Sequence, residues 1–226
     1  MNKRQIKFID LGIVPYKQAY NIQLQYLNKT KERKKQGLFT ENYVLYVEHP
    51  HVYTLGKHGN SANLLLPPEL LKKINAEFVQ TDRGGDITYH GYGQIVAYPI
   101  FDLNNFGILI KRYIHSLEEV VIQTLADYGI HAQRLEGAPG VWLNDTNRPR
   151  PEKICAIGVR VSYGITMHGF AFNVNTDLNY FNYINPCGFT DKGVTSMEKE
   201  LGHKIDMNEV KFKLNHYFLK IFGKES

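Results

Sequence analysis

Three short segments combine glycines with side chains that can do chemistry. The first, residues 83–94, reads RGGDITYHGYGQ and places an arginine, a threonine and a histidine among four glycines. Because glycine has no side-chain bulk, the backbone there can approach a ligand closely or adopt a positive φ angle. With this density of glycines and polar groups, a ligand-binding loop and a bulged turn are about equally supported.

The second segment, residues 153–158, reads KICAIG, the third, residues 184–188, reads INPCG, and the cysteine of the third is the candidate nucleophile. Cys187 lies between Pro186 and Gly188, where a thiol is more accessible than in the core of a strand. Thiols react as thiolates, and at an ordinary pKa of about 8.5 only roughly a tenth is ionised near pH 7.5. A nearby cation could make the thiolate the major form, and the candidates are Lys153, His90 and His168.

The roles of Cys155 and His168 follow less directly from the sequence. Cys155 lies in the apolar run 154–161 and is expected to fill the core. The two cysteines are too few for a disulfide framework and lack the spacing of a zinc site, so a reducing compartment fits. His168, before Gly169 in the next apolar run, is equally compatible with a sheet histidine and a ligand contact.

Composition and charge limit the class of protein. The 226 residues are 43% hydrophobic, which is enough to bury the core of one domain. The net charge of +5 favours nucleic acid, anionic lipid or an acidic protein as partner, without deciding between them. The basic run 29–35 contains no aromatic residue, so a solvated helix end is favoured over a nucleic-acid platform. No apolar segment has the length of a membrane span or signal peptide, and we expect a cytoplasmic protein.

The elements that must position these segments alternate irregularly. No dinucleotide or phosphate-loop fingerprint follows a strand, which argues against a Rossmann fold. We therefore predict a single α+β domain over residues 1–226, with a mixed or antiparallel sheet flanked by helices. The expected strands are 6–11, 43–48, 52–55 and 78–81 and the hairpin 154–161 with 165–174; the expected helices are 15–37, 67–76, a core helix whose apolar face runs from Tyr113 to Tyr128, and 206–223.

Taken in order, the segments resemble the octanoyltransferase family, also called lipoyl(octanoyl) transferases or lipoate-protein ligases B. The resemblance covers about residues 43 to 196, and the combination of motifs is specific although each is weak alone. The matching motifs are Tyr53–Gly56, Arg83–Gln94, Lys153–Gly158, His168–Val174 and Pro186–Gly188.

The resemblance implies a fold and a set of site residues. The fold would be shared with biotin and lipoate protein ligases, with Cys187 as the catalytic cysteine and Lys153 as the residue that lowers its pKa. Neither ATP nor a metal is implied as cofactor. The implied contacts to the acyl substrate are Arg83, Gly84, Gly85, Asp86, Ile87, Thr88, Tyr89, His90, Ala156, Ile157, Gly158, Gly169, Phe170 and Ala171.

The implied reaction has two steps. Cys187 would take an octanoyl group from octanoyl-acyl carrier protein, and a lysine of a lipoyl domain would then accept it. The acceptors would be the lipoyl domains of 2-oxoacid dehydrogenase complexes and the glycine cleavage H protein, and neither nucleic acid nor membrane would be a partner. Lys153 would protonate the departing carrier thiol and later accept the proton of the lysine amine.

Three alternatives make different predictions. An ATP-dependent lipoate or biotin ligase would also use a lysine near position 153, but the Pro-Cys-Gly loop around Cys187 argues against it. A Cys–His hydrolase, with His168 or His90 as base, would make Lys153 dispensable. A non-enzymatic acyl-carrier or nucleic-acid binding module would retain its function after Cys187→Ala.

Overall fold

The computed structural model of this protein describes residues 4–146, 148–185 and 192–223, so Cys187 lies outside the described residues. In chain order the strands and helices are β1 (Ile6–Ile13), α1 (Tyr16–Lys35), β2 (Asn42–Glu48), β3 (Val52–Leu55), α2 (Pro68–Lys73), β4 (Glu77–Gln80), β5 (Ile87–His90), β6 (Gln94–Ile100), α3 (Ile110–Ala126), β7 (Gln133–Leu135), β8 (Ala138–Leu143), β9 (Glu152–Ser162), β10 (Ile165–Asn173), β11 (Gly193–Val194), α4 (Met197–Leu201) and α5 (Met207–Phe222). Short 3-10 turns cover Ser61–Asn63, Leu103–Asn105 and Leu178–Tyr183.

Most strands form one mixed sheet. Its order is β1-β2-β6-β10-β9-β8-β7, with β11 pairing with β9 off this path. The pairs β1–β2 and β11–β9 are parallel, and the other neighbours are antiparallel. The predicted α+β fold with a mixed sheet is therefore confirmed.

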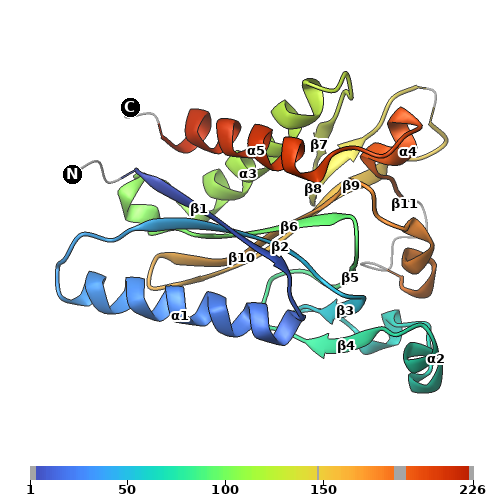
Figure 1. The fold of residues 1–226 in the computed structure, drawn as a ribbon, viewed down its shortest axis with the longest axis horizontal. Helices are drawn as coiled ribbons and strands as arrows, with labels where there is room; N and C mark the ends of the chain where they lie inside the picture. Colours follow the sequence, from blue (N-terminus) through green and yellow to red (C-terminus); the bar gives the residue numbers. More distant parts are fainter. Residues whose placement is uncertain (1–3, 147, 186–191, 224–226) are drawn as a thin grey trace.

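Helices cover both faces of this sheet, with α1 on one side and α3 and α5 on the other (Figure 1). Strand β2 shows why, because its side chains alternate between two apolar clusters. Tyr43 and Leu45 pack with α1, whereas Val44 and Tyr46 pack with α3 and α5. A strand that is buried on both faces lies in the interior of a three-layer structure. No helix among the described residues is long and apolar enough to cross a membrane.

Helix α3 is the central helix of the larger cluster. Tyr113, Leu117 and Leu125 are completely buried on its sheet-facing side, as the helical spacing predicts. The helix ends at Ala126, so Tyr128, predicted to lie on this face, follows it in a turn. The left-handed residue Gly129, with φ of 71°, follows this turn, and Tyr128 still packs against the core cluster.

The predicted hairpin is formed by β9 and β10. Their two-residue connection, Tyr163 and Gly164, has φ angles of 55° and 75°. A two-residue turn with two positive φ angles matches the right-handed twist of an antiparallel pair. Glycine adopts a positive φ easily, which explains its presence at the second position of this turn. The hairpin places residues 156–158 directly beside 169–171.

A second, three-stranded sheet has the order β4-β3-β5. It lies on the same side of the main sheet as α1 (Figure 1). The glycine-rich segment 83–94 runs from a loop through β5 and a short turn into β6, and so joins the two sheets. Residues of this segment are thereby held above the hairpin of the main sheet.

Candidate functional site

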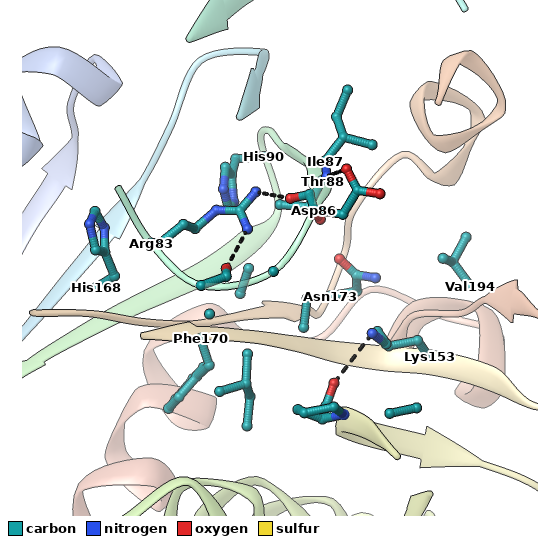
Figure 2. Close-up of a pocket in the computed structure, with 18 of the residues that line it drawn as sticks. Arg83, Asp86, Ile87, Thr88, His90, Lys153, His168, Phe170, Asn173 and Val194 are labelled. Carbon is teal, nitrogen blue, oxygen red and sulfur yellow. Dashed lines mark hydrogen bonds between the residues drawn. The ribbon is translucent and has the colours of Figure 1, made fainter. Parts of the chain in front are cut away.

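A cavity of about 670 Å³ lies where the glycine-rich segment meets β9 and β10. Figure 2 shows its wall, with Arg83 and His90 on one side and Lys153 extending from β9. The predicted site residues that line it are Arg83, Gly84, Gly85, Asp86, Ile87, Thr88, His90, Lys153, Ala156, Ile157, Gly158, Gly169, Phe170 and Ala171.

Tyr89 is the described site residue that does not line this cavity. Its side chain is completely buried in the smaller sheet, where its ring stacks on Tyr180 with centroids 4.9 Å apart. Its hydroxyl lies 2.7 Å from Nδ1 of His51. Neighbouring side chains of a strand point to opposite faces, so Tyr89 points away from Thr88 and His90, into the cluster of the smaller sheet; Ile87 belongs to that cluster too but also borders the cavity at the start of β5.

Lys153 reaches the cavity because of an irregularity in β9. The pairing of β9 with β8 skips Ile154, since Lys153 and Cys155 pair with consecutive residues of β8. Ile154 and Cys155 therefore both enter the α3–α5 core. With strict alternation Lys153 would share the face of Cys155, but the extra residue moves it to the face of Ala156, which lines the cavity.

The described residues on either side of the 186–191 segment also line this cavity. Asn185 does so on one side, where its N–H donates to Asn63 O at 2.8 Å. Lys192 does so on the other, just before β11, which pairs with β9 at Lys153. The described residues next to the segment that contains Cys187 thus line the same cavity as Lys153.

Cys155 is completely buried in the core, and burial raises the pKa of its thiol well above the ordinary value. A neutral thiol without solvent access is a poor nucleophile. The prediction that Cys155 fills the core is confirmed.

Arg83 is 8% exposed and braces the glycine-rich loop against β3. Its Nη2 donates to Thr54 O at 2.6 Å and to Asp86 O at 2.8 Å. Nε donates to Thr54 Oγ1 at 3.2 Å, and Nη1 donates to Gly84 O at 3.0 Å, a bond drawn in Figure 2. The buried guanidinium therefore fixes the course of this loop.

The two candidate histidines occupy different surroundings. His90 is bonded at both ring nitrogens, Nδ1 to Gln94 Oε1 at 2.9 Å and Nε2 to Thr54 Oγ1 at 3.1 Å. Burial lowers its pKa well below the ordinary value, so the ring is neutral. His168 is 1% exposed, and its Nε2 lies 2.7 Å from Asp82 Oδ1. Because it also lines the cavity, it is both a buried sheet residue and part of the cavity wall.

The glycines of the site allow chains to pass close to one another. A Cβ atom on Gly158 would lie 2.8 Å from Gly84 O, where the loop crosses β9. A Cβ atom on Gly169 would lie 2.1 Å from Ala97 O of β6. Both distances are too short for a side chain, so these glycines are required by the packing of the cavity wall.

Comparison with known proteins identifies the family. The model of the lipoyl protein ligase A/B catalytic domain matches residues 15–219. The chain belongs to this family. An octanoyltransferase from Bacteroides fragilis is 55% identical over 211 residues, which cover 93% of this chain and 95% of the relative. The predicted family and the predicted enzyme class, an acyltransferase of the octanoyltransferase type, are confirmed.

Solved structures of lipoyl protein ligase A/B family members and of biotin ligases share the fold. A bipartite lipoate protein ligase from Thermoplasma acidophilum has a TM-score of 0.71 at 16% identity, covering 98% of this chain and 85% of that one. A biotin protein ligase from Aquifex aeolicus has a TM-score of 0.51 at 14% identity, covering 97% of this chain and 71% of that one. At such identities the likeness shows the fold alone. The predicted fold, shared with lipoate and biotin protein ligases, is confirmed.

The sequence-based interpretation missed one part of the cavity wall. Pro139 and Trp142, both on β8, line the cavity beside Lys153. Trp142 is the single tryptophan of the chain, which was a signal that could have drawn attention to this strand. The Lys153 Nζ donates to Pro139 O at 3.3 Å, the bond drawn in Figure 2.

Two fully buried histidines make the stability of the protein depend on pH. Burial lowers the pKa of His49 to about 4 and that of His90 well below the ordinary value of 6.5. Above pH 6.5 both rings are neutral in the folded and unfolded chains, so histidine protonation does not lower the free energy of unfolding. Below it the unfolded chain binds protons that the folded protein does not, which costs about 1.4 kcal/mol per pH unit per histidine. We expect urea titrations to show this loss from about pH 6.5 down to about pH 4, where His49 becomes protonated in the folded protein as well.

His49→Gln is the matched variant for this expectation. The Nδ1–H of His49 donates to Val14 O (2.7 Å) and its Nε2 accepts from the Tyr98 hydroxyl (2.8 Å), and a glutamine amide offers one donor and one acceptor without titrating. In His49→Gln, the slope of the unfolding free energy against pH should be smaller by about 1.4 kcal/mol per pH unit, which corresponds to one proton. The exposed His216→Gln should keep the slope of the unaltered protein, and an unchanged slope in His49→Gln would contradict the assignment.

Proposed function

We propose that this acyltransferase moves an octanoyl group from octanoyl-acyl carrier protein to a lysine of a lipoyl domain, through a thioester on Cys187. One observation carries the proposal. The Lys153 side chain lines the same cavity as Asn185 and Lys192, the described residues that flank the segment holding Cys187. A thiolate nucleophile requires a nearby cation, and Lys153 shares the cavity with the described neighbours of the segment that contains Cys187.

The first step forms the acyl-enzyme. The Cys187 thiolate attacks the carbonyl carbon of the octanoyl thioester, a new C–S bond forms, and the bond to the carrier sulfur breaks. Lys153 donates a proton to that sulfur and becomes neutral. The products are octanoyl-Cys187 and free carrier thiol.

The second step reverses the role of Lys153. The amine of the acceptor lysine attacks octanoyl-Cys187, and neutral Lys153 accepts the proton that the nitrogen loses. An amide forms and the Cys187 thiolate is released, so the enzyme returns to its starting state. Exchange between thioesters is nearly balanced in energy and amide formation is downhill, so neither ATP nor a metal takes part in this scheme.

The cavity and the cysteines support this assignment. Val96, Ile157, Phe170 and Ala171 give part of the wall an apolar surface that suits a hydrocarbon chain. Cys155, the other cysteine, is buried and has a raised pKa, which leaves Cys187 as the candidate nucleophile. Among residues 4–146, 148–185 and 192–223, no group of three or more His, Cys, Asp or Glu side chains could hold a metal ion.

The proposal includes the predicted partners and location. The acceptors are the lipoyl domains of 2-oxoacid dehydrogenase complexes and the glycine cleavage H protein, the protein acts in the cytoplasm, and the 226 residues form one domain. The net charge of +5 favours acidic protein partners, which fits a role in capturing carrier and lipoyl domains.

Intact mass spectrometry tests the acyl-enzyme. Wild type, Cys187→Ser and Cys155→Ser are incubated with octanoyl-acyl carrier protein, and hydroxylamine is then added to cleave thioesters. We expect a hydroxylamine-labile octanoyl adduct on wild type and Cys155→Ser, and none on Cys187→Ser. An adduct on none of the three, together with ATP-dependent transfer of free octanoate, would replace the proposal by the ligase alternative.

A further inference from the structure

The side chain of Lys153 lies along strand β8. Its Cδ and Cε atoms are 3.6 and 3.3 Å from the place a Cβ atom of Gly140 would occupy. Its Nζ is 3.3 Å from Pro139 O and 4.5 Å from the centroid of the Trp142 ring. The lysine stem therefore passes over a glycine, and the ammonium ends between a carbonyl oxygen and an aromatic face.

The Trp142 ring is fixed in place. It is 2% exposed, and its Nε1 donates to Ala138 O at 2.9 Å, which ties the indole to its own strand. Strand β8 is itself paired on both sides, with β7 and with β9. A ring that cannot turn away offers a fixed site for a cation.

Other charged groups around this point are already engaged in structural contacts. Glu118, from α3, accepts from Gly140 N at 3.1 Å and forms an ion pair with Arg134 at 3.0 Å. Glu152, the neighbour of Lys153 on β9, pairs with Arg148 and Lys199. Among the described residues, the remaining charged side chains on the cavity wall are Arg83, Asp86, Arg150 and Lys192, and His90 and His168 are rings whose pKa burial lowers.

We propose that Trp142 is the positioning residue of Lys153, holding its ammonium at the cavity wall through a cation–π contact. The proposal deepens the proposed function, because the proton transfers of Lys153 belong to that function. Attraction between a ring face and a cation favours the charged form of the amine. The ring thereby keeps Lys153 charged and in place for the first step, in which it must donate a proton.

The first test reads the contact without any reaction. Because the chain contains one tryptophan, its fluorescence reports on Trp142 alone. Wild type, Lys153→Met and Lys199→Met are titrated up to and beyond an ordinary lysine pKa of about 10.4. We expect an inflection in wild type and Lys199→Met that Lys153→Met lacks, since only the latter removes the charge on the ring. Identical curves in all three proteins would overturn the proposal.

The second test reads the consequence for the reaction. In Trp142→Leu, which has no ring face, we expect kcat for octanoyl transfer to fall at least about tenfold while KM for the octanoyl carrier changes little. The limb of the pH–rate profile assigned to Lys153 should move down by about 0.5 to 1 pH unit, because the charged form loses its stabilisation. Trp142→Phe, which keeps a ring of smaller size, should lie between Trp142→Leu and wild type.

Folding of each variant is checked by thermal melting, and a Trp142→Leu protein that does not fold is replaced by Trp142→Phe. A folded variant with wild-type kcat and an unshifted pH limb would overturn the positioning role. The two proposals fail in distinguishable ways. If the fluorescence inflection depends on Lys153 but Lys153→Met transfers octanoyl groups normally, the positional contact stands and the catalytic role of Lys153 is wrong.

Discussion

Replacing Lys153 by methionine is expected to lower kcat for octanoyl transfer by about 10³-fold, within the range of lost general acid–base catalysis. Methionine keeps an unbranched stem of similar length over Gly140 but carries neither charge nor proton. The Cys187 thiolate would also lose its cation, so the pKa read from the pH dependence of iodoacetamide alkylation should rise toward about 8.5. The rate is measured in single turnovers with octanoyl-acyl carrier protein.

Lys153→Arg separates the two roles that the proposal gives to this residue. Arginine keeps a positive charge, but at a pKa above about 12 it cannot become the neutral base that the second step requires. We expect the Cys187 pKa to remain near that of wild type, while transfer from the acyl-enzyme to a lipoyl domain falls as far as in Lys153→Met.

Two controls complete this experiment. Hydroxylamine is a neutral amine that needs little help from a base, so it should still release octanoate from acylated Lys153→Arg. Lys199→Met removes a cation that pairs with Glu152 outside the cavity and should react like wild type. Full activity in Lys153→Met would instead support a hydrolase-like mechanism with a histidine base.

Replacing Arg83 by methionine is expected to destabilise the protein by about 3 kcal/mol or more, because buried acceptors lose a charged donor. The acceptors are backbone oxygens of Thr54, Gly84 and Asp86 together with the Thr54 hydroxyl. For a chain of this length, such a loss lowers Tm by roughly 10 °C. Urea unfolding and thermal melting measure the two quantities.

The result decides between two roles of Arg83. The family resemblance implies a contact to the acyl substrate, whereas the hydrogen bonds show a brace between β3 and the glycine-rich loop. Arg83→Lys keeps the charge but cannot make the branched set of bonds, so it should recover only part of the lost stability. Wild-type stability in Arg83→Met, combined with a higher KM, would show that the arginine serves the substrate instead.

Several elements of this protein could be predicted from local sequence patterns. The hairpin of β9 and β10 follows from two apolar runs joined by a turn with glycine, and both strands form as predicted. Helix α3 follows from apolar residues at helical spacing, and Asp206 starts α5 by accepting from Asn208 N at 2.8 Å. The motifs also identified the family, because residue types and their order can be compared without any knowledge of the contacts in the fold.

Which side chains face the cavity depends on contacts that local patterns do not contain. Strict alternation predicts Lys153 on the core face of β9, and the skipped residue Ile154 reverses this through pairing with β8, a strand outside the motif. His168 shows the same limit, since alternation would place it with Phe170 in the α3–α5 core. Instead, the His168 side chain points toward Asp82. Its backbone has a φ of 58°, and its N–H donates to Gln23 Oε1 of α1. Bulges and left-handed residues depend on partners distant in sequence, so a local pattern cannot predict them.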